Sequence, residues 1–378
     1  MELKEYSIDQ MRPRVLVNAL KLHEGPERSP NGNFQHVLHL AAEMAMLPGI
    51  EVLILTDLDS HGPLAERIQE GRLIPTHLRI DSIRAADRAV VQAVRRLRPD
   101  IYHRPTGQLP FRDLHCATVV GIADLNFKHL PTPLLKRLYK ELSYRWTMRK
   151  ADRVICVSGY TRDDVAKRYR GVAGRLRVVP HGTNELPLAD NSLAQLQAGP
   201  FFLVFGNQAH KNVELCLRAF AELNGAIPGL WLALVGRNEH VETALRPMVN
   251  RLGLDAAIEF VGAPTGAQLA GLYKRATGLL FPSRFEGFGL PILEAMGAGC
   301  PVVCSNVCSL PEVAGEAAIM LDPDDVAGMR AAILTLVRDT AHRAEFIAAG
   351  HKQAARFTWR RAADLTEAIY REILYPQN

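Results

Sequence analysis

Short apolar runs alternate along most of the chain with longer segments whose apolar positions recur every three or four residues. The short runs are typical of buried strands, and the longer segments are typical of helices that cover a sheet. This alternation predicts an α/β fold built on parallel sheets. The predicted strands are residues 15–20, 51–56, 101–103, 117–123, 153–158, 176–180, 201–206, 231–235, 258–261, 278–281, 302–304 and 318–321.

The alternation breaks down between about residues 183 and 200, where Pro, Asn, Asp, Ser and Gly accumulate. A chain of 378 residues is also longer than one hydrophobic core usually supports. We therefore predict two Rossmann-like domains, residues 1–184 and 201–356, with a linker at 185–200 and a C-terminal helix at 357–378. Because ligands of open parallel sheets bind beyond the carboxyl ends of the strands, we expect the two domains to face each other across a binding cleft.

The composition is that of a globular protein, with 48% hydrophobic and 22% charged residues. We expect neither a membrane-spanning helix nor a secretion signal, because no long apolar stretch occurs and the first residues are charged. Six cysteines in a chain of this length do not indicate a disulfide framework, so a reducing, cytoplasmic location is expected. Cys300, Cys304 and Cys308 have a spacing that would suit a metal, but packing of small residues around a buried strand is favoured because no histidine is close by.

The net charge of +5 is concentrated in residues 128–150, where seven basic residues stand beside a single acid, Glu141. We predict an amphipathic helix with a basic face over residues 133–150. Its apolar side chains recur every four residues, at Leu134, Leu138, Leu142 and Trp146. Three interpretations stay open: a solvated helix packed on its own domain, contact with an anionic membrane surface, and binding of nucleic acid, for which the expected aromatic residues are not interleaved.

A glycine-rich loop between the strand at 278–281 and a helix that begins near Pro291 carries the strongest motif. Free amides and the positive end of the helix dipole would meet an anion such as a diphosphate there. Glu286 lies before the helix and Glu294 lies one turn into it, where carboxylates can accept hydrogen bonds from sugar hydroxyls; two ordinary surface acids would have the same spacing. The loop residues whose backbone is expected to approach the ligand are Gly287, Phe288, Gly289 and Leu290.

A second loop, residues 206–212, joins the first strand of the second half to a helix expected from near Val213. Gly206 and Asn207 open this loop, and the glycine would allow close approach to a ligand. Lys211 offers a cation to phosphate oxygens beside a helix N-terminus. A surface lysine at a helix start is the alternative, but taken together with the glycine-rich motif after residue 281 the phosphate role is favoured.

The loops of the first half give weaker signals. Gly32 lies in a polar loop at residues 23–36, which is either an acceptor or phosphate loop or a plain connection, and His36 is expected on a helix surface. Asp124 follows a strand and would either position a substrate at the cleft or cap the next turn. Thr161, with an acid three residues later, is predicted to cap the helix that follows residue 158.

These motifs, in this order, resemble the family-four retaining glycosyltransferases, which have the GT-B fold of two Rossmann-like domains. Glu286 and Glu294 match the E-x7-E signature of that family, and Ser-Leu-Pro-Glu-Val-Ala-Gly at 309–315 resembles the sequence just after it. The resemblance covers nearly the whole chain. It implies that the first domain binds the acceptor, that the second binds the nucleotide-sugar donor, and that the C-terminal helix crosses back onto the first domain.

The resemblance also implies roles for the motif residues. Lys211 and the amides around 287–290 would hold the diphosphate, Glu294 would bind the ribose, and Glu286 would bind the donor sugar near its reacting carbon. Lys211, Glu286 and Asp124 are therefore the expected catalytic residues, and neither a metal nor another cofactor is expected.

Two departures from the family pattern bear on activity. Ala123 stands where the family usually has histidine, and His210 stands where its phosphate loop often has arginine. The phosphate loop is also about one residue shorter. Either a substrate is held differently in this protein or the activity is lower than in the family, and an inactive relative is one alternative.

The resemblance implies hexosyl transfer with retention, and GDP-mannose is the preferred donor because the motifs look like those of bacterial polysaccharide enzymes. A saccharide or lipid-linked saccharide is the expected acceptor, which the basic helix would suit at the cytoplasmic face of a membrane. A nucleotide-sugar epimerase of the same fold and a membrane- or nucleic-acid-binding module are rival interpretations. A pyridoxal-phosphate phosphorylase is disfavoured, since no lysine here has a context that asks for that cofactor.

Overall fold

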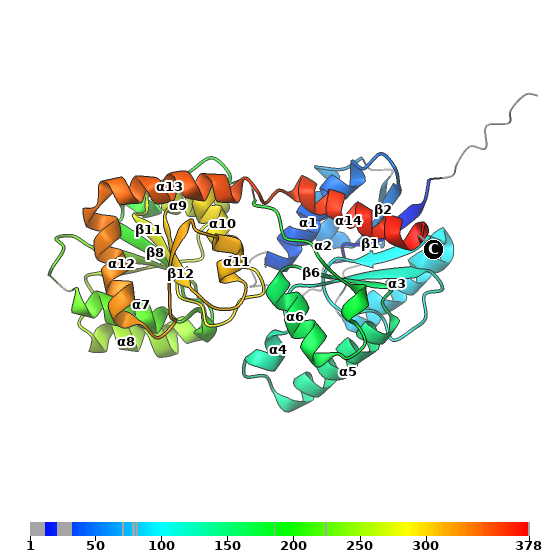
Figure 1. Ribbon diagram of the computed structural model, residues 1–378, viewed down its shortest axis with the longest axis horizontal. Coiled ribbons are helices and arrows are strands. Elements are labelled where there is room, and N and C mark those ends of the chain that lie inside the picture. Colours follow the sequence, from blue (N-terminus) through cyan, green and yellow to red (C-terminus); the bar gives the residue numbers. More distant parts are fainter. Residues whose placement is uncertain are drawn as a thin grey trace, which may run out of the picture.

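The computed structural model describes residues 12–20, 32–69, 72–77, 80, 82–184, 186–223 and 225–376. Two lobes follow one another along the chain, and each consists of a parallel sheet flanked by helices (Figure 1). The prediction of an α/β chain with two Rossmann-like halves is confirmed.

The first sheet has seven parallel strands in the order β3-β2-β1-β4-β5-β6-β7. The strands are β1 (Arg14–Asn18), β2 (Glu51–Thr56), β3 (Leu73–Pro75), β4 (Ile101–Arg104), β5 (Ala117–Ile122), β6 (Arg153–Cys156) and β7 (Leu176–Val178). The helices are α1 (Gly32–Ala45), α2 (Leu58–Ala65), α3 (Ile83–Leu97), α4 (Asn126–His129), α5 (Leu134–Lys150) and α6 (Gly159–Arg168). Neither α2 nor β3 was predicted from the sequence, because Pro63 interrupts the helical pattern and the strand is three residues long.

The second sheet has six parallel strands in the order β10-β9-β8-β11-β12-β13. The strands are β8 (Phe201–Phe205), β9 (Trp231–Val235), β10 (Ile258–Gly262), β11 (Gly278–Phe281), β12 (Val302–Ser305) and β13 (Ala318–Leu321). The helices are α7 (Val213–Glu222), α8 (Arg246–Arg251), α9 (Gly266–Arg275), α10 (Leu290–Gly297), α11 (Leu310–Ala314), α12 (Val326–Arg338) and α13 (Thr340–Ala354). Every residue of β9 and of β11 is buried, as expected for strands covered on both faces.

Both sheets reverse their strand order beside the first strand of the domain. The reversal lies between β1 and β4 in the first sheet and between β8 and β11 in the second. At such a switch point the loops leave the sheet in opposite directions and open a crevice at the carboxyl ends of the strands. The fold therefore places the loops after β8 and β11 where a ligand of the second domain would bind.

The last helix, α14 (Trp359–Leu374), lies on the first domain beside α1, although α13 before it belongs to the second (Figure 1). Trp359, Ala363 and Tyr370 are part of the hydrophobic core of the first domain. The Tyr370 hydroxyl lies 2.6 Å from Nδ1 of His103 on β4. The expected crossing of the C-terminal helix is therefore present, and it joins the two ends of the chain in one core.

Two local expectations were wrong. His36 is buried rather than on a helix surface, because His181 and Trp359 pack against its ring with centroids 4.0 and 5.5 Å away. Helix α6 begins before Thr161: Ser158 is its N-cap and accepts a hydrogen bond from the Thr161 amide. The first error arises from a long-range contact, whereas the second is local, because Ser158 caps the helix and leaves the Thr161 hydroxyl to bond to Gly287 of the other domain.

The predicted helix over residues 133–150 is confirmed as α5. Within the described part of the chain, no helix combines the length and the hydropathy that crossing a bilayer requires.

Candidate active site

Lys211 and Glu286 meet at the switch point of the second sheet. Lys211 ends a short turn of 3-10 helix after β8, and Glu286 lies in the loop after β11. The Lys211 Nζ is 2.6 Å from Oε1 of Glu286, although the residues are 75 positions apart in the sequence. Their side chains are 15% and 13% exposed, so this ion pair is largely shielded from water while one side of it stays accessible. Two residues selected from separate motifs thus form one charged centre.

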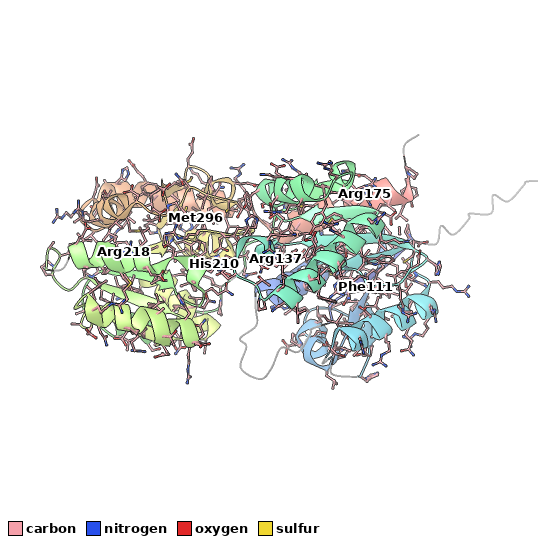
Figure 2. All side chains as sticks on the ribbon, turned by 90° about the horizontal axis from the view of Figure 1, so that it is seen from below. Phe111, Arg137, Arg175, His210, Arg218 and Met296 are labelled. Atoms are coloured by element: carbon pink, nitrogen blue, oxygen red, sulfur yellow. The ribbon has the colours of Figure 1, made fainter. Side chains whose placement is uncertain are left out.

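Main-chain hydrogen bonds hold the two loops together. The Arg284 amide donates to the His210 carbonyl at 2.8 Å, and His210 lies on the side of the second domain that faces the first (Figure 2). The Asn212 side chain adds to this, because its Nδ2 donates to the carbonyls of Pro282 and Pro323 at 3.1 and 2.7 Å. Asn212 has a φ of 57°, a left-handed conformation that asparagine adopts more readily than most residues. These hydrogen bonds of Asn212 were not predicted from the sequence, although an asparagine directly before a helix start was a usable signal.

Ser309 fixes the glycine-rich loop from the other side. Its hydroxyl lies 3.0 Å from the Glu286 carbonyl and 2.9 Å from the Phe288 carbonyl. Ser309 is fully buried, so these bonds form away from water and keep the loop in one shape. The residue belongs to the 309–315 segment, whose physical purpose the sequence did not reveal.

Glu294 lies one turn into α10 and is held at both oxygens. Asn184 Nδ2 donates to Oε1 at 2.9 Å, and the Tyr273 hydroxyl donates to Oε2 at 3.2 Å. Burial raises the pKa of the Glu294 carboxyl, while these two hydrogen bonds act in the opposite direction. Each carboxylate oxygen has a further lone pair, so Glu294 can still accept a hydrogen bond from a ligand.

The glycines of the loop have different reasons for being glycine. Gly289 has a φ of 108° at the start of α10, where a side chain would be strained. A Cβ on Gly287 would lie 2.1 Å from the carbonyl oxygen of Ala123 in the first domain. Contact with the first domain therefore gives a second reason for glycine at position 287, and close approach of a ligand to its backbone stays a prediction.

The remaining residues expected to bind the donor differ in exposure. Phe288 is buried, with its ring against His181 and Phe357, so only its backbone could serve a ligand; Leu290 is half-buried. A Cβ on Gly206 would lie 2.8 Å from a methyl group of Leu234, which gives that glycine a packing role. Asn207 is exposed, and its carbonyl accepts a hydrogen bond from Asn238. Donor contacts of these residues stay predictions.

Hydroxyl groups of the first domain bond to the glycine-rich loop. Ser158 Oγ and Thr161 Oγ1 lie 2.8 and 3.2 Å from the Gly287 carbonyl. The Glu312 carboxylate of α11 accepts the Gly159 amide at 2.8 and 3.0 Å, at the N-terminus of α6. These contacts join the domains directly beside Glu286. None of them could be assigned from the sequence.

Asp124 lies on the first-domain side of the contact between the two domains, next to Ala123. Its Oδ1 accepts the Asn126 amide at 2.8 Å, which is the capping role left open above. Burial raises the pKa of Asp124, and the negative charge of Glu286 adds to that rise. The Asp124 side chain lies against the glycine-rich loop, since a Cβ on Gly287 would be 2.9 Å from the Asp124 Cβ. Gly32 is the first residue of α1, while residues 23–31 of its loop lie outside the described residues. The acceptor role of Gly32 stays a prediction.

The described residues contain no group of three or more His, Cys, Asp or Glu side chains arranged to hold a metal ion. Cys300 and Cys304 are buried in the core of the second domain, in agreement with the packing interpretation.

Comparisons with known proteins agree with this geometry. Residues 191–353 match the family described as glycosyl transferases group 1, and residues 30–185 match glycosyltransferase family 4, so the two matches span most of the chain. The chain is 29% identical over 352 residues to the O-antigen chain mannosyltransferase B of Escherichia coli, covering 89% of this chain and 90% of that protein. It is 28% identical over 272 residues to the GDP-mannose:cellobiosyl-diphosphopolyprenol alpha-mannosyltransferase of Komagataeibacter xylinus, covering 69% and 67%.

A solved structure shares the whole architecture. Sucrose-phosphate synthase from Thermosynechococcus elongatus superposes with a TM-score of 0.74 at 21% identity, covering 97% of this chain and 100% of that one.

Proposed function

This chain is a family-four-like glycosyltransferase of the GT-B fold, and we propose that it transfers mannose from GDP-mannose with retention of configuration. The acceptor would be a saccharide or lipid-linked saccharide in the synthesis of a surface polysaccharide. The observation that carries the proposal is the Lys211–Glu286 pair at the switch point of the second sheet, together with Glu294 one turn into α10. The relatives' names support the sugar: one is a mannosyltransferase of an O-antigen chain, and the other names GDP-mannose as donor.

The donor diphosphate would bind between Lys211 and the start of α10. A diphosphate competes with Glu286 for the Lys211 ammonium, because charge-assisted hydrogen bonds to phosphate oxygens replace the pair at 2.6 Å. The backbone at the start of α10 and the positive end of its dipole add a second attraction for the anion. Glu286, released from Lys211, would then accept hydrogen bonds from the mannose hydroxyls, and Glu294 would accept one from the ribose.

Transfer breaks the bond between the anomeric carbon and a diphosphate oxygen. Negative charge develops on the leaving diphosphate, where Lys211 and the α10 amides stabilise it without a metal, and positive charge develops on the sugar beside Glu286. The acceptor hydroxyl oxygen forms the new bond from the face that the diphosphate leaves. Its proton goes to a phosphate oxygen, and retention follows from attack on that face.

Closure of the two domains would keep water out of this reaction. Gly287 is in contact with Ala123 and bonded to Ser158 and Thr161, so the first domain covers the loop that carries Glu286. Excluding water strengthens the electrostatic contacts and limits hydrolysis of the donor. Asp124, on the first domain across from Glu286, would position the acceptor hydroxyl.

Helix α5 favours an acceptor at a membrane. Its apolar stripe does not face the core: the buried residues are Ser143, Tyr144, Thr147 and Met148. The exposed large side chains on and beside it are Leu134, Leu135, Leu138, Tyr139, Leu142 and Phe111, with exposures of 79, 82, 54, 39, 54 and 47%. Lys136 and Arg137 are exposed among them, and Figure 2 labels Arg137 and Phe111 on the first domain. Apolar residues mixed with basic ones suit the cytoplasmic face of a membrane that contains anionic lipid.

A thermal-shift panel of UDP-, GDP-, dTDP- and ADP-sugars tests the donor. GDP-mannose at a hundred times its dissociation constant should add about 2.7 kcal/mol to stability, whereas the other sugars should add less. If another nucleotide-sugar stabilises the protein most, the GDP-mannose assignment is wrong, although a transferase would remain.

Incubation with GDP-mannose, with and without a mannose-terminated saccharide, tests the reaction itself. We expect product to form with the saccharide and slow turnover of the donor alone. Fast release or inversion of the sugar without acceptor would indicate an epimerase instead. The anomeric proton coupling of the product, measured by NMR, decides between retention and inversion.

A further inference from the structure

The two passages of the chain between the domains lie against each other beside Glu294. The Thr183 amide donates to the Phe357 carbonyl at 2.9 Å, and the Thr183 hydroxyl lies 3.3 Å from the Ala354 carbonyl. A Cβ on Gly182 would lie 2.3 Å from the Trp359 nitrogen, so the passages are in close backbone contact. They therefore form a single hinge, and a change in the angle between the domains acts on both passages together.

Asn184 connects this hinge to Glu294. Its Nδ2 donates to Oε1 of Glu294 at 2.9 Å, and its Oδ1 accepts the indole N–H of Trp359 at 3.2 Å. The indole N–H can only donate, so it fixes which end of the amide faces Trp359 and which end faces Glu294. The carboxylate in the second domain and the first residue of α14 are thus joined through one side chain.

The indole ring is itself fixed in the first domain. Trp359 is 7% exposed and belongs to the core that α1 and α14 share. His36 and His39 of α1 stack on it, with centroids 5.5 Å away and interplanar angles of 17° and 8°. The indole N–H therefore moves with the first domain, whereas Glu294 moves with the second.

We propose that Asn184 is a positioning residue that aims the Glu294 carboxylate at the ribose of the donor and links that aim to domain closure. The inference rests on the proposed role of Glu294 as the ribose ligand. With Asn184 on one oxygen and Tyr273 on the other, the carboxylate has one orientation and keeps its remaining lone pairs for the ribose hydroxyls. The same two hydrogen bonds favour the ionised carboxylate, which accepts more strongly than the neutral acid.

Binding of GDP and of 2′,3′-dideoxy-GDP, measured by calorimetry, isolates the ribose hydroxyls. The wild-type protein should prefer GDP by roughly tenfold or more, as expected for hydrogen bonds to a charged group. In Asn184→Ala the preference should fall toward one while the affinity for dideoxy-GDP stays unchanged. Trp359→Phe keeps a ring but loses the N–H donor, and it should lower the preference part of the way.

Thr183→Val is the matched control. Thr183 lies in the same hinge segment as Asn184, and its hydroxyl bonds to Ala354 and not to Glu294. Loss of that hydroxyl should therefore leave the preference for GDP unchanged. Equal weakening of both nucleotides by Asn184→Ala, or an unchanged preference, would show that Asn184 has a structural role alone and would overturn the proposal.

A measurement without nucleotide separates this inference from the proposed function. Carbon-13 NMR of labelled glutamate carboxyls, with Glu294 assigned by comparison with Glu294→Gln, follows the titration of Glu294. Loss of the Asn184 donor should raise its pKa in both Asn184→Ala and Asn184→Asp, and an unchanged titration would overturn the positioning role. A protein that binds no nucleoside diphosphate would contradict the proposed function, yet this titration would still decide whether Asn184 holds Glu294.

Discussion

The two domains repeat one strand order but use their strand ends differently. In the second domain the loops after β8 and β11 are bonded to each other and present an ion pair, Lys211 and Glu286. In the first domain the loops after β5 and β6 present two hydroxyls that bond to Gly287 and a carbonyl that lies against it. They also present the half-buried acid Asp124. The shared topology places these loops at the strand ends in both domains. The side chains on the loops decide that the second domain supplies the ion pair and the first domain covers it.

The strongest way to break this comparison is to remove the charge from the second domain. Lys211→Ala and Glu286→Gln should each lower kcat by on the order of a hundredfold or more, because each removes a charge placed beside the reacting atoms. Single-turnover measurement of mannose transfer gives the number, and Lys274→Ala provides an exposed lysine of the same domain as control. Wild-type rates in either variant would remove that residue from the mechanism.

A second variant tests whether the first domain contributes closure. Gly287→Ala places a carbon 2.1 Å from the Ala123 carbonyl, so the domains must separate. Misplacement by about 1 Å can cost roughly a hundredfold in rate, and we expect a loss of tenfold to a hundredfold in kcat/KM. X-ray scattering should show an increased radius of gyration. In Gly174→Ala the added carbon meets nothing within 4 Å, and both values should stay those of the wild type.

Helices α5 and α14 extend the comparison to the surface. Both combine apolar and basic residues, yet α14 buries its apolar side on α1 while α5 exposes Leu134 and Leu135. Replacing both leucines by glutamine should weaken binding to vesicles of phosphatidylethanolamine and phosphatidylglycerol by roughly tenfold, because less apolar surface then moves from water into the membrane. Co-sedimentation measures this, with Leu188→Gln, 94% exposed in the wild type, as control. Equal binding by both variants would favour a solvated α5.

The charged half of that surface gives a separable effect. Lys136→Gln with Arg137→Gln should reduce binding to the same vesicles, and raised salt should remove the difference, because each basic residue near an anionic surface contributes about 1 kcal/mol. Vesicles of phosphatidylcholine alone should not distinguish the variants. Salt-independent loss would show that the two residues act on the fold of α5 instead.

The sequence was sufficient for the sheets, because parallel strands buried on both faces are written as short apolar runs at regular intervals. It was also sufficient to select Lys211, Glu286 and Glu294, since each follows a strand or opens a helix in a motif. It did not reveal Asn184 or Ser309, whose importance depends on partners 110 and about 20 residues away. Hydrogen bonds across such separations have no local pattern.

Whether a given face of a helix is buried could not be predicted from the local sequence either. The pattern of α5 predicted an apolar side, and the structure leaves its leucines exposed. His36 was expected on a surface because it is polar, yet it is covered by Trp359 from a distant part of the chain. Periodicity identifies a side of a helix, but a second element must be placed before that side is known to be covered.

Acid stability should also differ between the domains. Burial lowers the pKa of His103 and of His181 to about 3, from an ordinary value of 6.5, and His36 is shifted in the same direction. Between those pH values the unfolded chain binds protons that the folded chain excludes. The stability from these neutral histidines is therefore present above about pH 6.5 and is lost as the pH falls toward 3.

His103→Asn can keep a hydrogen bond to the Tyr370 hydroxyl. It should reduce by about one the number of protons that the unfolded chain binds in excess of the folded chain. The free energy of unfolding of the first domain should then fall less steeply with acidification, by about 1.4 kcal/mol per pH unit between pH 4 and 6. Hydrogen exchange of β4 amides in urea measures the first domain separately from β8 and β11. Identical slopes for His103→Asn and the wild type would mean that His103 is protonated in the folded protein, and the acid sensitivity would have to arise elsewhere.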